Sequence, residues 1–217
     1  MSSKAYQVVA ADDFLTGQEN SDLLSGFSAK ARIEVESLAQ QLFLTGEARL
    51  RRSVIFAEMS SHASNLWLTA GIAVTVARAV DRDVRVLHVE RAPLPTHPAI
   101  PAACEQICAA VGNCALETVA AENGRGQVRS LGDRLAQLSA ADAFTLIHLS
   151  DVVRSQDILS ALAGSVDGIV LLVQENAVRK AAAENVSSLL RALRIPVAGV
   201  VLIDRTYPIP EPLYKRL

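Results

Sequence analysis

The sequence lacks a surplus of basic residues: 21 Lys and Arg stand against 23 Asp and Glu, and the formal net charge is −2 at pH 7. Since phosphate backbones are bound through excess positive charge, this composition argues against nucleic acid as the main partner. Long hydrophobic runs are absent as well. The longest, residues 66–80, is shorter than the roughly 20 residues that span a bilayer and includes Arg78, so it predicts a buried helix.

The first residues, MSSKAYQVVAADDF, contain no apolar segment long enough for a signal peptide, so we expect a protein that is not exported. Cysteine is scarce and odd in number, with only Cys104, Cys108 and Cys114. An odd set without an export signal favours reduced thiols. Two thiolates at helical spacing without a nearby His make a poor zinc site, so we expect these cysteines to pack in the core.

Half of the 217 residues are hydrophobic, which is enough apolar material for one domain with a substantial core. Residues 1–30 show no sustained periodicity and predict a flexible N-terminal arm. A single domain is expected over residues 31–217, and its first element is predicted as a helix at 31–44.

The rest of the domain alternates between strand and helix patterns. Apolar runs of strand length occur at residues 54–59, 84–89, 144–150, 168–174 and 197–203, with a weaker one at 114–119. Helical spacing is found between them, at residues 65–80, 101–111, 128–138, 155–163 and 178–194. Near-continuous apolar strands are typical of parallel sheets covered on both faces. The prediction is a doubly wound α/β fold with a mostly parallel sheet of about five to seven strands.

In such sheets, ligands bind outside the carboxyl ends of the strands, so the loop after strand 54–59 is the first candidate site. A phosphate-binding loop needs glycines for close backbone approach, a Lys for the phosphates and a Ser or Thr for magnesium. The loop here, MSSHASNLW, has no Gly and no Lys. Its position therefore predicts a nucleotide site, while its composition does not.

The chain resembles bacterial tyrosine autokinases in the order of its segments: SVIFAEM, LTAGIAVTVARAV, RVLHVER, FTLIHLSD, DGIVLLVQENAVRK, IPVAGVVLIDR and YPIPEPLYKRL. These kinases are the cytoplasmic domains of capsular and exopolysaccharide co-polymerases, and they are related to the MinD and ParA ATPases. The resemblance covers about residues 31–217 and implies the P-loop ATPase fold.

The same resemblance places the nucleotide-binding positions on altered residues. The phosphate-loop Lys of the family corresponds to Asn65 and the next Ser or Thr to Leu66, while the loop glycines fall near His62 and Ser64, with Ser61 beside them. Asn65 has no positive charge, and Leu66 has no oxygen for a metal. This loop is therefore predicted to be a vestige of a phosphate site.

The acidic motifs of the family have changed too. Its second motif corresponds to Glu90 and Ala92, of which only Glu90 could bind a cation. The Asp of its third motif falls on Ser150, and the neighbouring Asp151 either restores that carboxylate or caps the following turn. The Asn near the base corresponds to Asp204.

Because phosphoryl transfer depends mostly on charge stabilisation, the loss of these groups predicts negligible activity. We assign no catalytic residue, no metal ligand and no cofactor, and we expect ATP and magnesium binding to be lost or weak.

Several other residues allow two interpretations. His88 and His148 lie inside apolar strands, and we favour satisfied core residues over ligands, on strands that could be adjacent. Trp67 either fills the vacated phosphate site or faces the core. Ser61 and His62 lack an evident orienting acid, which favours ordinary loop polarity over a nucleophile.

The resemblance also bears on assembly. Tyr207 and Tyr214 remain where active kinases carry autophosphorylated tyrosines, and we favour docking of the tail over phosphorylation by another kinase. The family's oligomerisation helix, Glu-x-x-Arg-x-x-Arg, corresponds to Glu36, Ala39 and Leu42. Both arginines are missing, so the ring assembly of the family is not expected from this helix.

These features predict a catalytically inactive component of bacterial exopolysaccharide or capsule biosynthesis and export. The implied partner is the cytoplasmic part of an inner-membrane polysaccharide co-polymerase, which would hold the protein at the membrane periphery; a homo-oligomer stays open. One alternative is an active kinase or ATPase in which Glu90 and Asp151 hold a metal. Another is a MinD-like or ParA-like positioning protein, which the C-terminal sequence EPLYKRL disfavours because it is no amphipathic membrane helix.

Overall fold

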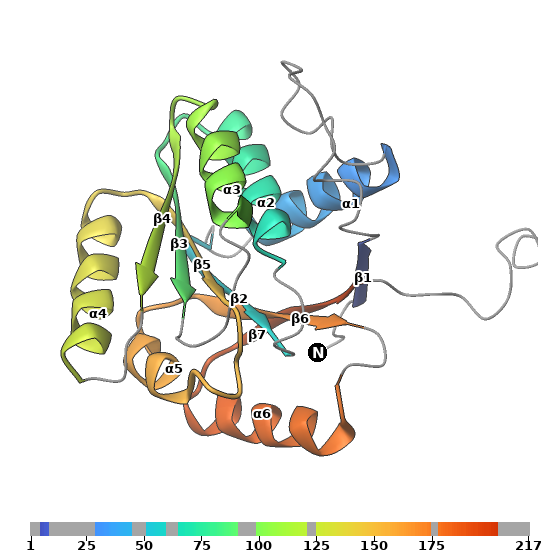
Figure 1. Ribbon diagram of the computed structural model, residues 1–217, viewed down its shortest axis with the longest axis vertical. Helices are drawn as coiled ribbons and strands as arrows, with labels where there is room; N and C mark the ends of the chain where they lie inside the picture. The colour runs from blue at the N-terminus through green and yellow to red at the C-terminus, as the bar shows by residue number, and fades with distance from the viewer. Residues whose placement is uncertain are drawn as a thin grey trace, which may run out of the picture.

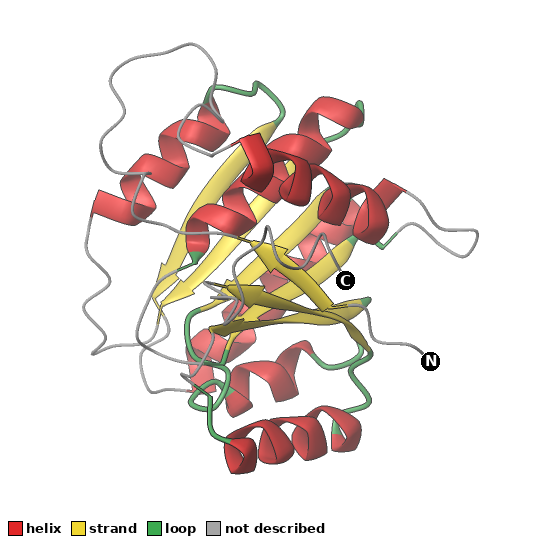
Figure 2. Cartoon of the chain, turned by 90° about the vertical axis from the view of Figure 1, so that its right-hand side faces the viewer, coloured by secondary structure: helices red, strands yellow, loops and turns green. Residues whose placement is uncertain are grey.

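A parallel β-sheet with helices on both faces forms the described part of the chain (Figures 1 and 2). The computed structural model describes residues 5–8, 29–44, 51–59, 65–90, 99–120, 125–174 and 178–203. The seven strands are β1 (Ala5–Val8), β2 (Ser53–Glu58), β3 (Val84–Glu90), β4 (Cys114–Ala120), β5 (Phe144–Leu149), β6 (Gly168–Gln174) and β7 (Val197–Ile203). The helices are α1 (Ala29–Ala39), the π-helix η2 (Gln40–Leu44), α2 (Leu66–Ala79), α3 (Ala99–Ala109), α4 (Arg125–Ala140), α5 (Gln156–Leu162) and α6 (Lys180–Ala192).

The strand order is β1-β7-β6-β2-β5-β3-β4, and every pairing is parallel. The predicted doubly wound α/β fold is therefore confirmed. All carboxyl ends of the strands meet at one edge of the sheet, and β2 lies centrally there, between β5 and β6. Helices α1, α2 and α3 cover one face, and α4, α5 and α6 cover the other (Figure 1).

The strand β1 is an addition to the expected elements. It lies inside the segment predicted as an N-terminal arm, and it pairs with β7 at the edge of the sheet. No strand is predicted there from the sequence because four residues are too few to establish a periodicity.

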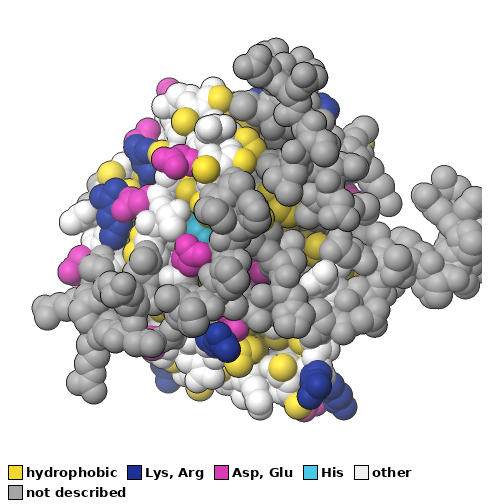
Figure 3. Space-filling view, in the orientation of Figure 1, with side chains coloured by type: hydrophobic (Ala, Val, Ile, Leu, Met, Phe, Trp, Pro, Cys, Tyr) yellow, Lys and Arg dark blue, Asp and Glu magenta, His cyan; other side chains and the backbone are white. Residues whose placement is uncertain are grey.

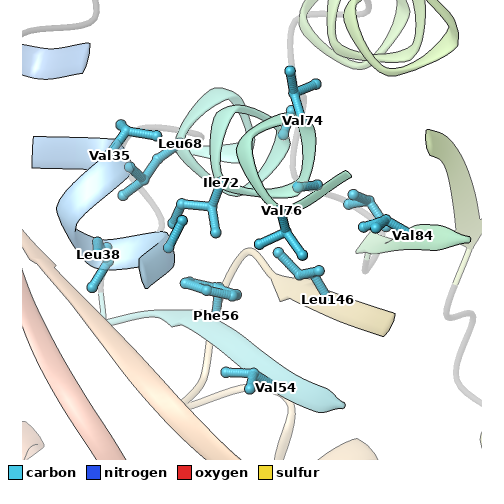
Figure 4. Close-up of a cluster of buried hydrophobic side chains, with 14 of the residues drawn as sticks. Val35, Leu38, Val54, Phe56, Leu68, Ile72, Val74, Val76, Val84 and Leu146 are labelled. Carbon is cyan, nitrogen blue, oxygen red and sulfur yellow. The ribbon is translucent and has the colours of Figure 1, made fainter. Parts of the chain in front are cut away.

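Burial explains why the central strands have near-continuous apolar sequences. Every residue of β2 and of β5 is buried. One core cluster lies between the sheet and α1, α2 and α3, and a second lies under α4, α5 and α6. In Figure 4, Ile72 and Val76 of α2 point toward Phe56 of β2 and Leu146 of β5. Each of these side chains is fully buried.

Helix α2 is the most enclosed helix described here. All but three of its 14 residues are buried, as expected for a helix that is hydrophobic on every side. This confirms the buried helix predicted for residues 66–80. Within the described ranges, no helix has both the length and the apolar character needed to cross a membrane.

Candidate functional site at the carboxyl end of the sheet

Three neighbouring strands carry the same pattern on the face toward α2: two apolar residues followed by one titratable residue. The pattern is Val54, Phe56 and Glu58 on β2, Phe144, Leu146 and His148 on β5, and Val84, Val86 and His88 on β3. In the sheet register, His148 is paired with Phe56 on one side and with His88 on the other. The titratable side chains therefore gather at the carboxyl end of the sheet, where α/β proteins bind ligands.

Glu58, His148 and His88 form a hydrogen-bonded line across the three strands. Oε1 of Glu58 lies 3.0 Å from Nε2 of His148, and Nδ1 of His148 lies 3.0 Å from Nδ1 of His88. All three residues are at most 1% exposed. The line ends at Nε2 of His88, which has no hydrogen-bond partner within the described residues.

The line begins at the N-terminus of α2. The backbone N–H of Asn65, the residue directly before the helix, donates to Oε1 of Glu58 at 2.5 Å. The Asn65 side chain makes no capping hydrogen bond of its own. The first N–H groups of a helix lack intrahelical partners and attract acceptor oxygens. The acceptor here is a carboxyl oxygen from the end of β2.

Burial keeps this cluster uncharged near neutral pH. Desolvation raises the pKa of Glu58 to about 9, the Asn65 N–H opposes this shift, and the charge of Asp151 adds to it. Desolvation also lowers the pKa of His148 to about 3. For His88, desolvation and then His148 lower the pKa to about 3, against a smaller opposing effect of Glu90. The raised pKa of Glu58 and the lowered pKa of His148 both favour the neutral side chains near pH 7. The contact between Glu58 and His148 is therefore a hydrogen bond rather than an ion pair.

The two altered positions of the predicted phosphate site are both buried. Asn65 is 6% exposed, and Leu66, the first residue of α2, is fully buried. A buried leucine side chain at the start of the helix offers no ligand to a metal or a phosphate. Trp67 is also buried, within the core cluster between the sheet and α1–α3, which is the core-facing alternative left open by the sequence.

Asp151 caps the turn after β5. Its Oδ1 accepts the backbone N–H groups of Val153 at 3.0 Å and Arg154 at 3.1 Å. Its Oδ2 lies 3.7 Å from Nε of Arg154. Of the two predicted roles of Asp151, the structure thus shows the turn cap.

The other acidic-motif positions lie nearby but are not joined into a metal site. Ser150 follows β5 and is buried, and Glu90 ends β3 and is partly exposed. Among the described residues, no group of three or more His, Cys, Asp and Glu side chains is arranged to hold a metal ion. Glu90 and Asp151 therefore belong to no such cluster in the part of the chain that is described.

Six predicted positions lie outside the described residues: Ser61, His62, Ser64, Asp204, Tyr207 and Tyr214. Of the predicted vestigial pocket, the structure thus places Asn65, Leu66, Glu90, Ser150 and Asp151. All five belong to the carboxyl ends of β3 and β5 and the start of α2, or directly adjoin them.

Two further predictions concern the helices. The packing of the three cysteines in the core is confirmed, since Cys104, Cys108 and Cys114 are free and buried. In the helix compared with the family's oligomerisation motif, Ala39 and Leu42 are buried. These positions therefore face the core, where they offer no surface for a ring contact.

Charges of both signs are interspersed on the face shown in Figure 3, without a basic patch among the described residues drawn there. One exposed pair on the surface is Arg134 with Glu117, whose atoms Nη2 and Oε2 lie 2.9 Å apart.

Glu58 is the site residue that sequence reasoning missed. The apolar run VIFAEM predicts a strand, and that prediction gives its acidic residue no role. A usable signal was present, because Glu58 and the two histidines each follow apolar residues at i−2 and i−4 on their strands. Alternate residues of a strand share a face, so these three residues continue buried apolar rows.

Three solved structures are similar to this chain over nearly their whole length or most of it. The chimerical protein CapA2B2 matches at a TM-score of 0.65 with 13% identity, covering 93% of this chain and 94% of that one. The kinase domain of the Escherichia coli tyrosine kinase ETK matches at a TM-score of 0.61 with 12% identity, covering 94% and 92%. The BceF tyrosine kinase domain matches at 0.55 with 15% identity, covering 83% and 81%.

These matches confirm at the level of fold the resemblance to bacterial tyrosine kinase domains that the sequence indicates. No protein-family model matches the sequence, and no curated protein matches it either. At 12% to 15% identity, the structural matches establish the fold and leave the chemistry of the site to its own residues.

Proposed function

We propose that this protein is a catalytically inactive relative of bacterial tyrosine kinases that works by protein–protein contact in exopolysaccharide or capsule biosynthesis and export. Its partner in this proposal is the cytoplasmic part of an inner-membrane polysaccharide co-polymerase. Contact with that partner would place the protein at the periphery of the membrane. The proposal is supported by a fold similar to that of a tyrosine kinase domain, together with the uncharged Asn65 at the position that the resemblance gives to the phosphate-loop Lys.

The observation that supports inactivity best is the contact between Glu58 and Asn65. In the position of the family's phosphate-loop Lys, the chain has an uncharged residue whose backbone N–H is already bonded to a buried carboxyl group. The next residue, Leu66, is fully buried and apolar. Phosphoryl transfer is catalysed mainly by positioning and by stabilising negative charge, and neither is available from these groups. We therefore propose that no ATP and no magnesium is used.

Inactivity is tested by calorimetric titration with Mg-ATP and by an autophosphorylation assay on the full chain, with the E. coli ETK kinase domain as the positive control. We expect no heat of binding at micromolar nucleotide and no phosphotyrosine. Micromolar affinity together with turnover would refute this part of the proposal.

The partner is tested separately. The full chain is used as bait for the cytoplasmic segments of the co-polymerase encoded in the same organism, and the polymer made by a deletion strain is measured. We expect retention of the co-polymerase segments and reduced or altered polymer. If nothing is retained and the deletion strain makes normal polymer, the proposed role in assembly is wrong.

A further inference from the structure

We propose that Cys108 and Cys114 form a redox-active dithiol, which a hydroperoxide oxidises to an intramolecular disulfide between α3 and β4. Cys114 reacts with the peroxide, and Cys108 then completes the disulfide. The dithiol is independent of the proposed function, because Cys114 begins β4 and so lies at the opposite end of the parallel sheet from the candidate site.

The two cysteines lie on either side of the turn that joins α3 to β4. Cys108 is in the last turn of α3, and Cys114 is the first residue of β4. Between them, Val111 donates its backbone N–H to the carbonyl oxygen of Cys108 at 3.0 Å and accepts the N–H of Cys114 at 2.7 Å. Helix α3 also lies against β4 (Figure 1). The backbone thus holds the two cysteines together before any oxidation.

The side chains of the two cysteines are in contact. The S–H of Cys108 donates a hydrogen bond to the sulfur of Cys114. An S–S bond is about 2 Å long, so two sulfur atoms already in hydrogen-bond contact need only a small movement of their side chains to form it. Cys104, four residues before Cys108, is fully buried, and burial raises the pKa of its thiol to about 12. Cys104 therefore stays a protonated core residue.

Cys114 is the more reactive thiol of the pair. The hydrogen bond from Cys108 lowers the pKa of Cys114, burial opposes this shift, and the charge of Arg85 adds to the lowering. Thiolates rather than thiols attack oxidants, so the stabilised thiolate of Cys114 is the nucleophile. Cys114 is also the more accessible of the two, at 5% exposed against 0% for Cys108. The hydrogen bond and burial raise the pKa of Cys108, which keeps its proton for the second step.

The oxidation proceeds in two balanced steps. The thiolate of Cys114 attacks one oxygen of hydrogen peroxide; an S–O bond forms, the O–O bond breaks, and hydroxide leaves with the proton that Cys114 had released, as water. Cys114 is now a sulfenic acid, and the peroxide is reduced. The sulfur of Cys108 then attacks the sulfur of Cys114; the S–S bond forms, the S–O bond breaks, and the leaving hydroxide takes the proton of Cys108 as a second water. A thiol reductant reverses the disulfide.

The test follows the full chain by mass spectrometry after treatment with hydrogen peroxide. The folded, reduced protein is oxidised without denaturant, then unfolded with N-ethylmaleimide to label the remaining thiols, and cleaved after glutamate. Cleavage gives the peptide 106–117, which contains both cysteines of the dithiol but not Cys104. We expect this peptide to lose two hydrogen atoms and both labels, and to regain both labels after dithiothreitol, while Cys104 stays labelled. The proposal is overturned if the peptide keeps both labels, or if the disulfide includes Cys104 or joins two molecules.

Three single variants assign the roles. Cys104→Ala is the matched control and should form the disulfide as wild type does. Cys108→Ala cannot complete the disulfide, so the sulfenic acid on Cys114 should persist and be captured by dimedone. Cys114→Ala removes the reacting thiolate, so Cys108 should remain an unmodified thiol.

Dimedone capture on Cys108 in Cys114→Ala, as strong as that on Cys114 in Cys108→Ala, would refute the assigned order. Loss of the disulfide in folded Cys104→Ala would refute the assigned pair. The wild-type measurement needs no substitution, so it decides whether the dithiol exists even where a variant fails to fold.

Discussion

The middle of the sheet and its carboxyl end differ sharply on the face toward α2. In the middle, β2, β5 and β3 present only apolar side chains, such as Phe56 and Leu146. One pleat further on, two of the same strands present His88 and His148, and the third presents Glu58. All of these residues are buried to a similar degree. The comparison teaches that this chain has a buried polar layer at the carboxyl end of its sheet, which is the level at which α/β proteins bind ligands.

The two regions should respond differently to substitution. In the apolar middle, stability depends on volume and buried area, so the effect of a mutation should not depend on pH. At the carboxyl end, stability depends on the partners of polar atoms and on their protons. Four predictions follow from this difference, ordered by the expected change in the free energy of unfolding.

Phe56→Ala should have the largest effect. Phe56 is fully buried in the core, so its truncation leaves a cavity under α2. We expect a loss of about 3–5 kcal/mol in the free energy of unfolding. Urea unfolding at several pH values between 6 and 8 measures it. A loss below about 2 kcal/mol, or one that changes with pH, would contradict the description of this region as purely apolar.

His148→Leu should destabilise the protein by about 3 kcal/mol, because two buried groups each lose a partner at about 1–3 kcal/mol. Glu58 loses its neighbour at 3.0 Å, and His88 loses the only hydrogen bond described for it. Urea unfolding at pH 7 measures the loss. Leu and His have similar volumes, so an effect below about 1 kcal/mol would mean that the hydrogen-bonded line contributes little.

The strands and helices were predictable from the sequence, while their spatial neighbours were not. Residues 54–59 and 144–150 are recognisable as strands from their own apolar runs. That β2 lies beside β5 depends on pairing between segments about 90 positions apart, for which the chain contains no local signal. The short strand β1 was missed for a related reason, since it owes its structure to β7.

The site was predictable only in part for the same physical reason. The place of the loop after a strand predicts a site there, and the resemblance to the kinase family singles out Asn65 and Leu66. His88 and His148 are predicted as core histidines on strands that could be adjacent, and the sheet register confirms that they are. Glu58 is not predictable as a site residue because its role depends on contacts with Asn65, directly before α2, and with His148 on β5. The choice between two roles for Asp151 needed the backbone geometry of the turn.

The third prediction concerns the pH dependence of stability. Glu58 has its pKa raised from 4.5 to about 9, so its contribution to stability is full below pH 4.5 and is lost as the pH rises toward 9. His88 and His148 have pKa values lowered from 6.5 to about 3, so their contribution is full above pH 6.5 and is lost as the pH falls. Each proton changes the free energy of unfolding by about 1.4 kcal/mol per pH unit. Below pH 6.5, the loss of stability from the two histidines as the pH falls is larger than the gain from Glu58. Above pH 6.5, only Glu58 contributes, and stability falls as the pH rises. The cluster therefore favours greatest stability near pH 6.5.

Glu58→Gln isolates the alkaline part of this profile. The variant cannot ionise at this position, so stability should stop falling between pH 7 and 9. Between pH 4.5 and 6.5, stability should rise with pH more steeply than in wild type, because the opposing effect of Glu58 is gone and both histidines still contribute. Chemical unfolding at half-unit steps of pH measures both parts. Glu117→Gln, at an exposed carboxylate, should keep the wild-type profile. If Glu58→Gln loses stability with rising pH as steeply as wild type does, the proton on Glu58 is not part of the folded state.

The smallest effect is expected for His88→Leu, within about 1 kcal/mol of wild type. The substitution leaves Nδ1 of His148 without its partner, which is unfavourable. It also removes Nε2 of His88, a buried nitrogen that has no partner within the described residues. One unsatisfied atom is thus exchanged for another at nearly constant volume, unlike His148→Leu, which adds two. Urea unfolding of the two variants side by side measures the difference. If His88→Leu is as destabilising as His148→Leu, the line acts as one unit that extends to His88, and the polar layer must then be described as spanning all three strands rather than as centred on Glu58.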